Sequence, residues 1–216
     1  MKFIIKQQEP IELSEWKTKK LKHQRKPWKK IPIEIKVAVR EALKQEQGFI
    51  CCYCECRISS DNDCHVEHLR PQSKFPALAL AYDNMLASCQ QDLEPEEPAR
   101  CGTKKADWFD ESLVVSPLDE SCENRFKFND QGDIAPADSG DDAARETIDK
   151  LALNIDWLRA RRKKAIREAL NDESTPDQMR RPIDGFQHKD ENGRFEPFCF
   201  AIIQILHRYL GNLVTE

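Results

Sequence analysis

The stretch CCYCEC (51–56) places four thiols within six residues, together with one tyrosine and one glutamate. Cysteines this crowded are poorly spaced for disulfides, and a hydrophobic core rarely needs them. Cys51 and Cys54 have C-x-x-C spacing, in which two thiolates on one tight turn can both reach a tetrahedral zinc ion at about 2.3 Å. The sequence has nine cysteines, and in a reducing cytosol this pattern favours metal ligation over disulfides.

A second pair of thiols is needed to close such a site. Cys89 and Cys101 are the downstream cysteines that flank a turn-like segment, SCQQDLEPEEPARCG (88–102). Their separation is long for a zinc knuckle, but an exposed loop can be inserted without moving its ends. We therefore expect Cys89 and Cys101 to complete a structural zinc site with Cys51 and Cys54, the alternative being unrelated buried thiols. The remaining cysteines near the motif have no assigned role: Cys52, Cys56 and Cys64.

The composition is that of a water-soluble protein with a modest core. Charged residues make up 33% of the 216 residues, and no apolar run approaches the roughly 20 residues that a membrane-spanning helix needs. The apolar part of MKFIIKQQEP (1–10) is also too short for the hydrophobic region of a signal peptide. We therefore expect a cytoplasmic protein that does not span a membrane.

The distribution of charge is compatible with nucleic-acid binding although the net charge is −4. Residues 17–30 contain eight lysines and arginines and no acid, and residues 159–167 contain six. Because phosphate binding depends on fields that are screened over about 10 Å, local clusters matter more than the net charge. Either run can instead be a solvated helix face. In the second run, Arg161 and Arg162 are the candidate nucleic-acid contacts.

Three regions are expected along the chain. They are a basic N-terminal segment (1–47), a core of short strands and turns (48–135) and a helical C-terminal region (143–216). In the first, an arm or loop with Trp16 and Trp28 leads into a helix at 33–46. The spacing of its apolar residues predicts one apolar face, made by Ile33, Val37, Leu43 and their neighbours.

The other two regions carry their own signals. In the core, CHVEHL (64–69) predicts a strand, FKFNDQGDIAPA (126–137) a β-hairpin and QDLEPEEPAR (91–100) an exposed excursion. In the C-terminal region two helices meet at a turn capped by Asn154 or Asp156. A last, strongly apolar helix is expected to start after Pro197 and to end at Gly211.

Between the cysteine pairs lies a second constellation of polar residues. HVEHLRPQS (65–73) places Glu67 directly before His68, and DNMLASC (83–89) places Asn84 shortly before the third cysteine. A general base beside a metal-binding carboxylate on one strand, followed by an asparagine and a helix that returns to the metal, is the plan of a ββα-metal nuclease.

The order C-x-x-C, Glu-His-x-x-Pro, Asn, Cys…Cys-x-x-x-Lys resembles the HNH endonucleases of the His-Me finger group. Within that group it is most similar to the PtuB family, the HNH component of the Septu anti-phage system, which also accompanies some retrons. The resemblance covers about residues 45–165. Four segments carry it: CCYCECR (51–57), HVEHLRPQSKFPAL (65–78), DNMLASC (83–89) and RCGTKKAD (100–107).

This resemblance implies an α+β fold, with a ββα-metal (HNH) core that is stapled by a four-cysteine zinc site. It implies a metal-dependent endonuclease that hydrolyses DNA and acts in phage defence with an ATPase partner, PtuA in the resembled system. His68 is then the general base, because an imidazole with a pKa near 6.5 can take a proton from water at neutral pH. Glu67 is implied to bind a catalytic Mg²⁺ or Mn²⁺, with Glu where most HNH motifs have Asp. Asn84 is implied to hold the loop that orients His68, although a plain turn asparagine is the alternative.

The sequence departs from the HNH pattern at the third residue of the motif, the second histidine. In the HNH pattern a histidine follows the last cysteine. In this sequence those positions hold Gly102, Thr103, Lys104 and Lys105. Asp107 is the nearest carboxylate that could complete the metal site, whereas Lys105 could contact phosphate, and the second metal ligand stays open.

Three further residues near the motif are candidates. His65 lies on the same strand face as Glu67 and either supports the metal, contacts substrate or only packs. Arg70 and Lys74 suit contacts with phosphate, and ordinary surface cations are the alternative.

Two functions of different classes therefore remain. One is the DNA endonuclease, which the Glu67–His68 pair favours. The other is a catalytically inactive, zinc-stapled nucleic-acid-binding or adaptor module, which the missing third histidine favours.

Overall fold

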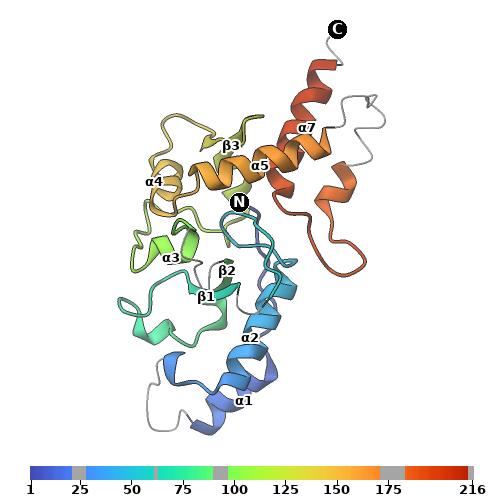
Figure 1. Ribbon diagram of the computed structural model, residues 1–216. Helices are drawn as coiled ribbons and strands as arrows, with labels where there is room; N and C mark the ends of the chain where they lie inside the picture. Colours follow the sequence, from blue (N-terminus) through green and yellow to red (C-terminus); the bar gives the residue numbers. More distant parts are fainter. Residues whose placement is uncertain (21–27, 61–62, 90–96, 171–182, 214–216) are drawn as a thin grey trace.

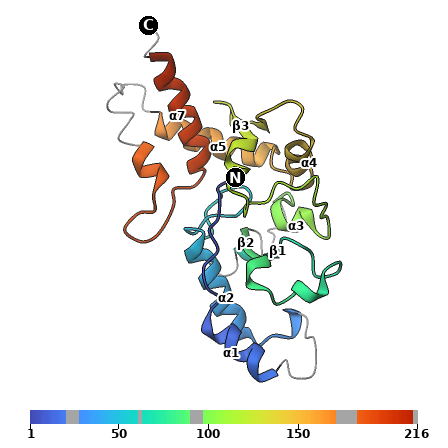
Figure 2. The ribbon, with the colours of Figure 1, turned by 180° about the vertical axis from the view of Figure 1, so that it is seen from behind.

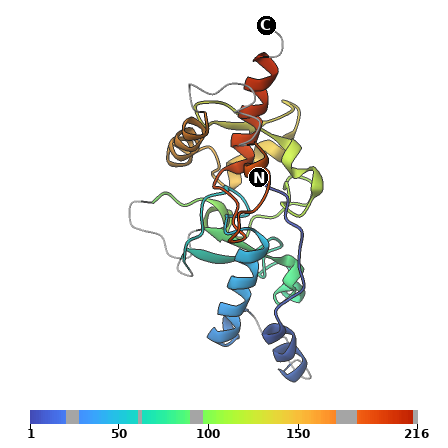
Figure 3. The same cartoon turned by 90° about the vertical axis from the view of Figure 1, so that its right-hand side faces the viewer.

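The computed structural model describes residues 1–20, 28–60, 63–89, 97–170 and 183–213. It is an α+β fold in which helices surround two small antiparallel sheets. The β1–β2 pair lies between α1 and α2 at one end and α4, α5 and α7 at the other, as all three ribbon views agree (Figures 1, 2 and 3). Within the described residues, no helix is long and apolar enough to cross a membrane.

The N-terminal region is more helical than the predicted arm. It contains α1 (Ile11–Lys20), a 3-10 turn η1 (Trp28–Lys30) and α2 (Ile33–Glu46). The helix predicted at 33–46 is confirmed as α2, but of the residues named for its apolar face only Leu43 is buried. Ile33 and Val37 are 58% and 42% exposed, whereas the buried stripe is Ile35, Val39 and Leu43. These three recur every four residues and face β1 and β2, which is the periodicity of one helix face.

The central part has the order strand, strand, helix. β1 (Cys64–His68) pairs antiparallel with β2 (Met85–Cys89), and α3 (Cys101–Lys105) follows and packs against β2. Two 3-10 turns, η2 (Pro76–Leu78) and η3 (Tyr82–Asn84), lie in the connection between the strands. In the register of the pair, Cys64 lies opposite Cys89 and His68 opposite Met85. Of the predicted excursion at 91–100, residues 91–96 lie outside the described residues.

The predicted hairpin at 126–137 is confirmed. After the 3-10 helix η4 (Glu120–Arg125), β3 (Phe126–Phe128) pairs with β4 (Ile134–Pro136), and the intervening turn is closed by Asn129. Gly132 in this turn has a φ of +80°, a value that glycine adopts without steric cost.

The C-terminal region contains α4 (Asp142–Lys150), α5 (Asp156–Ala169) and α7 (Cys199–Leu213), and residues 183–187 form a further short helical stretch. Two predicted boundaries are wrong. The residue before α5 is Ile155, which makes no side-chain cap, and Asn154 instead accepts a hydrogen bond from the Ile134 amide. α7 continues past Gly211 to Leu213, because one exposed glycine lowers helix stability without breaking the helix.

Candidate active site and cysteine cluster

The sulfur atoms of Cys51, Cys54, Cys89 and Cys101 all lie within 4.8 Å of one another, and all four side chains are buried. The Sγ atoms of Cys54 and Cys89 are 3.7 Å apart. A tetrahedral ion with bonds of about 2.3 Å to each sulfur needs a sulfur–sulfur distance of about 3.8 Å. The cluster therefore has the dimensions and the donor chemistry to hold a metal ion.

Three separate segments supply these thiols. Cys51 and Cys54 lie on a tight turn that is closed by the hydrogen bond from the Cys51 amide to the Cys56 carbonyl oxygen, 2.9 Å. Glu55 in this turn has a φ of +63°. Cys89 ends β2 and Cys101 begins α3. Burial alone raises the pKa of Cys54, yet hydrogen bonds led by that from Cys101 lower it to about 6. The pKa of Cys51 is also lowered, against the effect of burial, whereas the pKa values of Cys89 and Cys101 are raised. Two of the four thiols therefore ionise more readily than ordinary cysteines.

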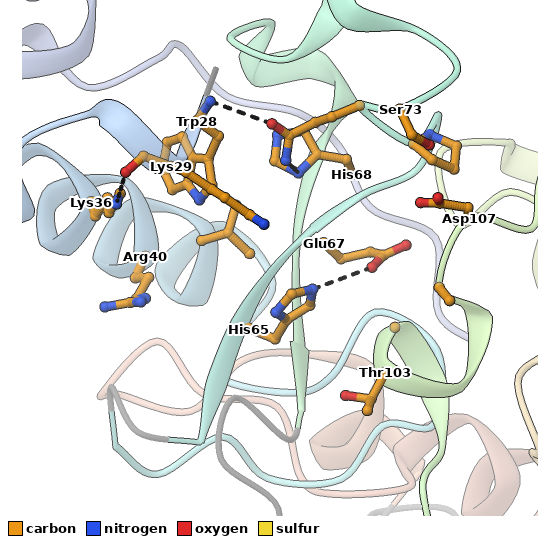
Figure 4. Close-up of a pocket in the computed structure, with 15 residues that line it drawn as sticks. Trp28, Lys29, Lys36, Arg40, His65, Glu67, His68, Ser73, Thr103 and Asp107 are labelled. Carbon is orange, nitrogen blue, oxygen red and sulfur yellow. Dashed lines mark hydrogen bonds and ion pairs between the residues drawn. The ribbon is translucent and has the colours of Figure 1, made fainter. Parts of the chain in front are cut away.

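The carboxylate of Glu67 is buried in the same region, with 3% of the residue exposed. Its Oε1 accepts hydrogen bonds from the Lys105 ammonium at 2.8 Å and from the Tyr53 hydroxyl at 3.1 Å. Its Oε2 lies 3.7 Å from Nε2 of His65. Figure 4 shows His65 and Glu67 side by side, as their positions on one face of β1 require.

Lys105 is therefore not the phosphate contact that the sequence suggested. Its side chain is 1% exposed, and its ammonium bonds to Glu67 and, at 3.1 Å, to the carbonyl oxygen of His68. A buried cation needs such partners, because an unpaired charge inside the protein is costly. Lys105 ties α3 to β1 and neutralises the Glu67 carboxylate. Tyr53, which sequence reasoning left without a role, supports the same carboxylate.

His68 is buried beside Glu67, with 6% of the residue exposed. Its Nε2 lies 3.1 Å from the carbonyl oxygen of Ala79 and its Nδ1 lies 3.2 Å from the amide nitrogen of Gln72. A carbonyl oxygen only accepts, so Nε2 carries the proton and Nδ1 carries the lone pair. Burial is the main cause that lowers the pKa of His68 to about 4. The imidazole is therefore neutral at pH 7.

Asn84 contacts the loop after β1 rather than the imidazole. Its Oδ1 accepts from the Arg70 amide at 2.9 Å, and its Nδ2 donates to the Arg70 carbonyl at 3.0 Å. It is 6% exposed. Asn84 thus satisfies both backbone groups of Arg70, two residues beyond His68 in the chain.

Glu67 and His68 both line one cavity of about 920 Å³. Its lining includes His65, Glu67 and His68 of β1. It also includes Thr103 of α3 and Asp107, which follows α3. Figure 4 shows Asp107 on the opposite side of Glu67 from His65. Asp107 is exposed. Glu67, His68 and Asp107 of the predicted site thus line a single cavity, and Asn84 lies outside its lining.

Three of the four remaining predicted cations are accessible to solvent, and the fourth, Arg162, is buried. Arg70 and Lys74 are accessible, and the Arg70 guanidinium pairs with Glu111 at 2.8 Å. Arg161 is exposed and stacks on the Trp157 ring at 3.3 Å.

Arg162 does not fit the nucleic-acid contact that the sequence suggested, because it is 2% exposed. Its guanidinium donates to the carbonyl oxygens of Gly132 and Leu153. Two basic residues that are adjacent in a helix point in different directions, and here one faces the interior.

No protein-family model matches the chain. Over 139 residues it is 35% identical to a curated protein of Vibrio cholerae serotype O1 biovar El Tor that is named "Retron Vc95 putative HNH endonuclease". The match covers 61% of this chain and 65% of the relative, so the chain spans less than two thirds of the relative's length.

Proposed function

We propose that this protein is a metal-dependent HNH endonuclease that hydrolyses DNA phosphodiester bonds. The observation that carries the proposal is the pair of Glu67 and His68, which are adjacent on β1 and line one cavity. The similarity to the Vibrio cholerae protein supports the nuclease activity, and the retron in that protein's name supports a role in anti-phage defence. The proposed partner is an ATPase like PtuA, which the resemblance to the PtuB family implies.

His68 is the proposed general base. Its lone pair is at Nδ1, and its pKa of about 4 keeps it neutral at pH 7. In the reaction the O–H of a water molecule replaces the Gln72 amide as the donor to Nδ1 and gives up its proton there. The water oxygen bonds to phosphorus while the bond from phosphorus to the 3′-oxygen breaks. The hydrogen bond to Ala79 fixes the tautomer throughout, and Asn84 holds the backbone of the following loop.

Glu67 and Asp107 are the proposed ligands of a catalytic Mg²⁺ or Mn²⁺. Both line the cavity, and carboxylate oxygens are the donors that these ions prefer. Lys105 and Tyr53 contact Oε1 of Glu67, and Oε2 lies 3.7 Å from Nε2 of His65. When bound, the ion would stabilise the charge on the leaving 3′-oxygen.

The cysteine cluster is the proposed structural zinc site, because four thiolates leave the ion no open position for water. Arg70, Lys74 and Arg161 are the proposed contacts with phosphate.

A second candidate function is a nucleic-acid-binding or adaptor module without catalysis. It is favoured by Gly102, which has no side chain to ligate a metal, and by Lys105, which already neutralises Glu67. The two functions differ in one measurable property, the cleavage of DNA.

Nicking of supercoiled plasmid in Mg²⁺ or Mn²⁺ tests the proposal, with the ATPase partner present and absent. We expect His68→Ala to lower the nicking rate by about 100-fold or more, the usual contribution of a positioned base. His207→Ala is the matched control, because His207 is an exposed histidine on α7. Equal cleavage by wild type and His68→Ala would remove His68 as the base. If wild-type protein cleaves nothing under either condition, the module function stands instead.

A further inference from the structure

The cavity beside His68 has a second wall that the proposed chemistry does not use. It is formed by Lys29 of η1 and by Lys36 and Arg40 of α2, and these three cations are here called the α2 wall. Figure 4 shows them on the side of the cavity opposite Asp107. Lys29 belongs to the basic run at 17–30, whereas Lys36 and Arg40 lie beyond its end and were not predicted from the sequence.

The α2 wall is fixed directly against the proposed base. The amide of Trp28 donates to Gln72 at 3.3 Å, and Gln72 in turn donates to His68. The Trp28 and His68 rings also contact edge to face, with centroids 5.9 Å apart. Lys36 fastens η1 to α2 through its hydrogen bond to the Lys29 carbonyl, 3.0 Å. A group held by the wall would therefore lie next to the atoms that react.

The side chain of Arg40 gives a second, independent indication that a ligand binds at the α2 wall. Its Nε is buried without a hydrogen-bond partner among the described residues, and its side chain lines the cavity. A buried donor without a partner is costly, and guanidinium groups pair readily with phosphate oxygens. Lys36 and Arg40 are one helical turn apart, about 6 Å along the axis. A duplex strand carries one phosphate for about every 3.4 Å of its axis, so the two cations suit phosphates of one strand.

From these contacts we propose that the α2 wall binds phosphates of the substrate strand next to the bond that is cut. The inference rests on the proposed nuclease function, and it adds a binding surface that is separate from Arg70, Lys74 and Arg161. Acids on the same helix do not oppose it. Glu41 pairs with Lys44, Glu46 pairs with Lys6, and Glu34 does not line the cavity.

Binding of a short fluorescein-labelled DNA duplex, measured by anisotropy with no added divalent ion, tests this surface without requiring cleavage. We expect Lys36→Gln with Arg40→Gln to weaken binding about tenfold or more. We also expect the slope of log K against log salt to fall by about two, one for each lost phosphate contact. Lys127→Gln is the matched control, because Lys127 is an exposed cation on β3, outside the cavity.

Unchanged affinity and salt slope in the double variant would overturn the inference. So would loss of ATPase binding with DNA affinity intact, which would make the wall a protein-docking surface. If Arg40→Gln fails to fold, Lys29→Gln with Lys36→Gln makes the same test at more accessible positions. Wild-type protein that binds DNA through the wall but never cuts it would refute the nuclease function alone, and wild-type protein that binds no DNA would refute both.

Discussion

Gly102 lies directly against the carboxylate of Glu67 and leaves no room for a side chain. A Cβ at this residue would lie 2.5 Å from Oε2 of Glu67 and 3.1 Å from Oγ of Ser88. Neither neighbour can move freely, because Glu67 is held by Lys105 and Ser88 Oγ accepts from the Gly102 amide at 3.1 Å. The absence of a side chain at 102 is thus matched to a long carboxylate at 67.

We predict that Gly102→Ala lowers the nicking rate by about 10- to 100-fold, because displacement of a site group by about 1 Å is that costly. It should also destabilise the fold by about 1–3 kcal/mol, the usual effect of overpacking. Initial nicking rates and urea denaturation measure the two effects.

Two further variants make this test specific. Gly185→Ala is the matched control, since a Cβ there meets nothing within 4 Å. Adding Glu67→Asp to Gly102→Ala shortens the carboxylate by one methylene and should recover part of the lost stability. Full activity in Gly102→Ala would show that Glu67 Oε2 has no defined place in the reaction.

At this scale the sequence predicted those positions that depend on local spacing. The C-x-x-C turn and the Glu-His pair are local, so the sequence predicted that Cys54 lies in the thiol cluster and that Glu67 and His68 share one strand. The pairing of Lys105 with Glu67 was not predicted, because it depends on how α3 packs against the β1–β2 pair. Ion-pair partners 38 residues apart leave no periodic signal in the sequence.

The packing of α5 against the β3–β4 hairpin depends on one buried arginine. Arg162 donates to the carbonyl oxygens of Gly132, in the hairpin turn, and Leu153, before the helix. Its guanidinium also lies 5.5 Å from the centre of the Phe128 ring. Both carbonyls would lose their donor if this side chain were removed.

We predict that Arg162→Ala destabilises the fold by about 3 kcal/mol, because two buried acceptors lose a charged donor and a cavity replaces the side chain. Arg167→Ala, at an exposed position on the same helix, should change the free energy of unfolding by less than about 0.5 kcal/mol. Urea denaturation of both variants measures the difference. Equal and small effects would instead assign Arg162 to the surface role that its basic neighbours suggest.

Element types were easier to predict than element faces. The helix at 33–46 and the hairpin at 126–137 follow from apolar periodicity and turn residues, and both are confirmed. The sequence did not identify the buried face of α2, because Ile33 and Val37 look as apolar as Ile35 and Val39. Only the position of β1 and β2 decides which stripe is covered.

At the scale of the whole molecule, the cysteine cluster joins three parts of the chain that are separate in the sequence. It links the turn at 51–54, the end of β2 and the start of α3, and the two strands of this sheet have only five residues each. So small a sheet is marginal by itself. A bound ion would therefore contribute directly to the folding of the region that carries Glu67 and His68.

We predict that the purified protein contains about one zinc ion per chain, bound by four thiolates. Cys54→Ser should lose the zinc and the cooperative thermal transition together, because the remaining ligands no longer close the site. Cys122→Ser is the matched control, since Cys122 is a buried thiol outside the cluster, and it should keep the zinc. Metal analysis and circular dichroism on heating measure both properties. A metal-free protein that melts cooperatively would show that packing alone folds this region, and Cys54→Ser should then also retain the DNA affinity of the α2 wall.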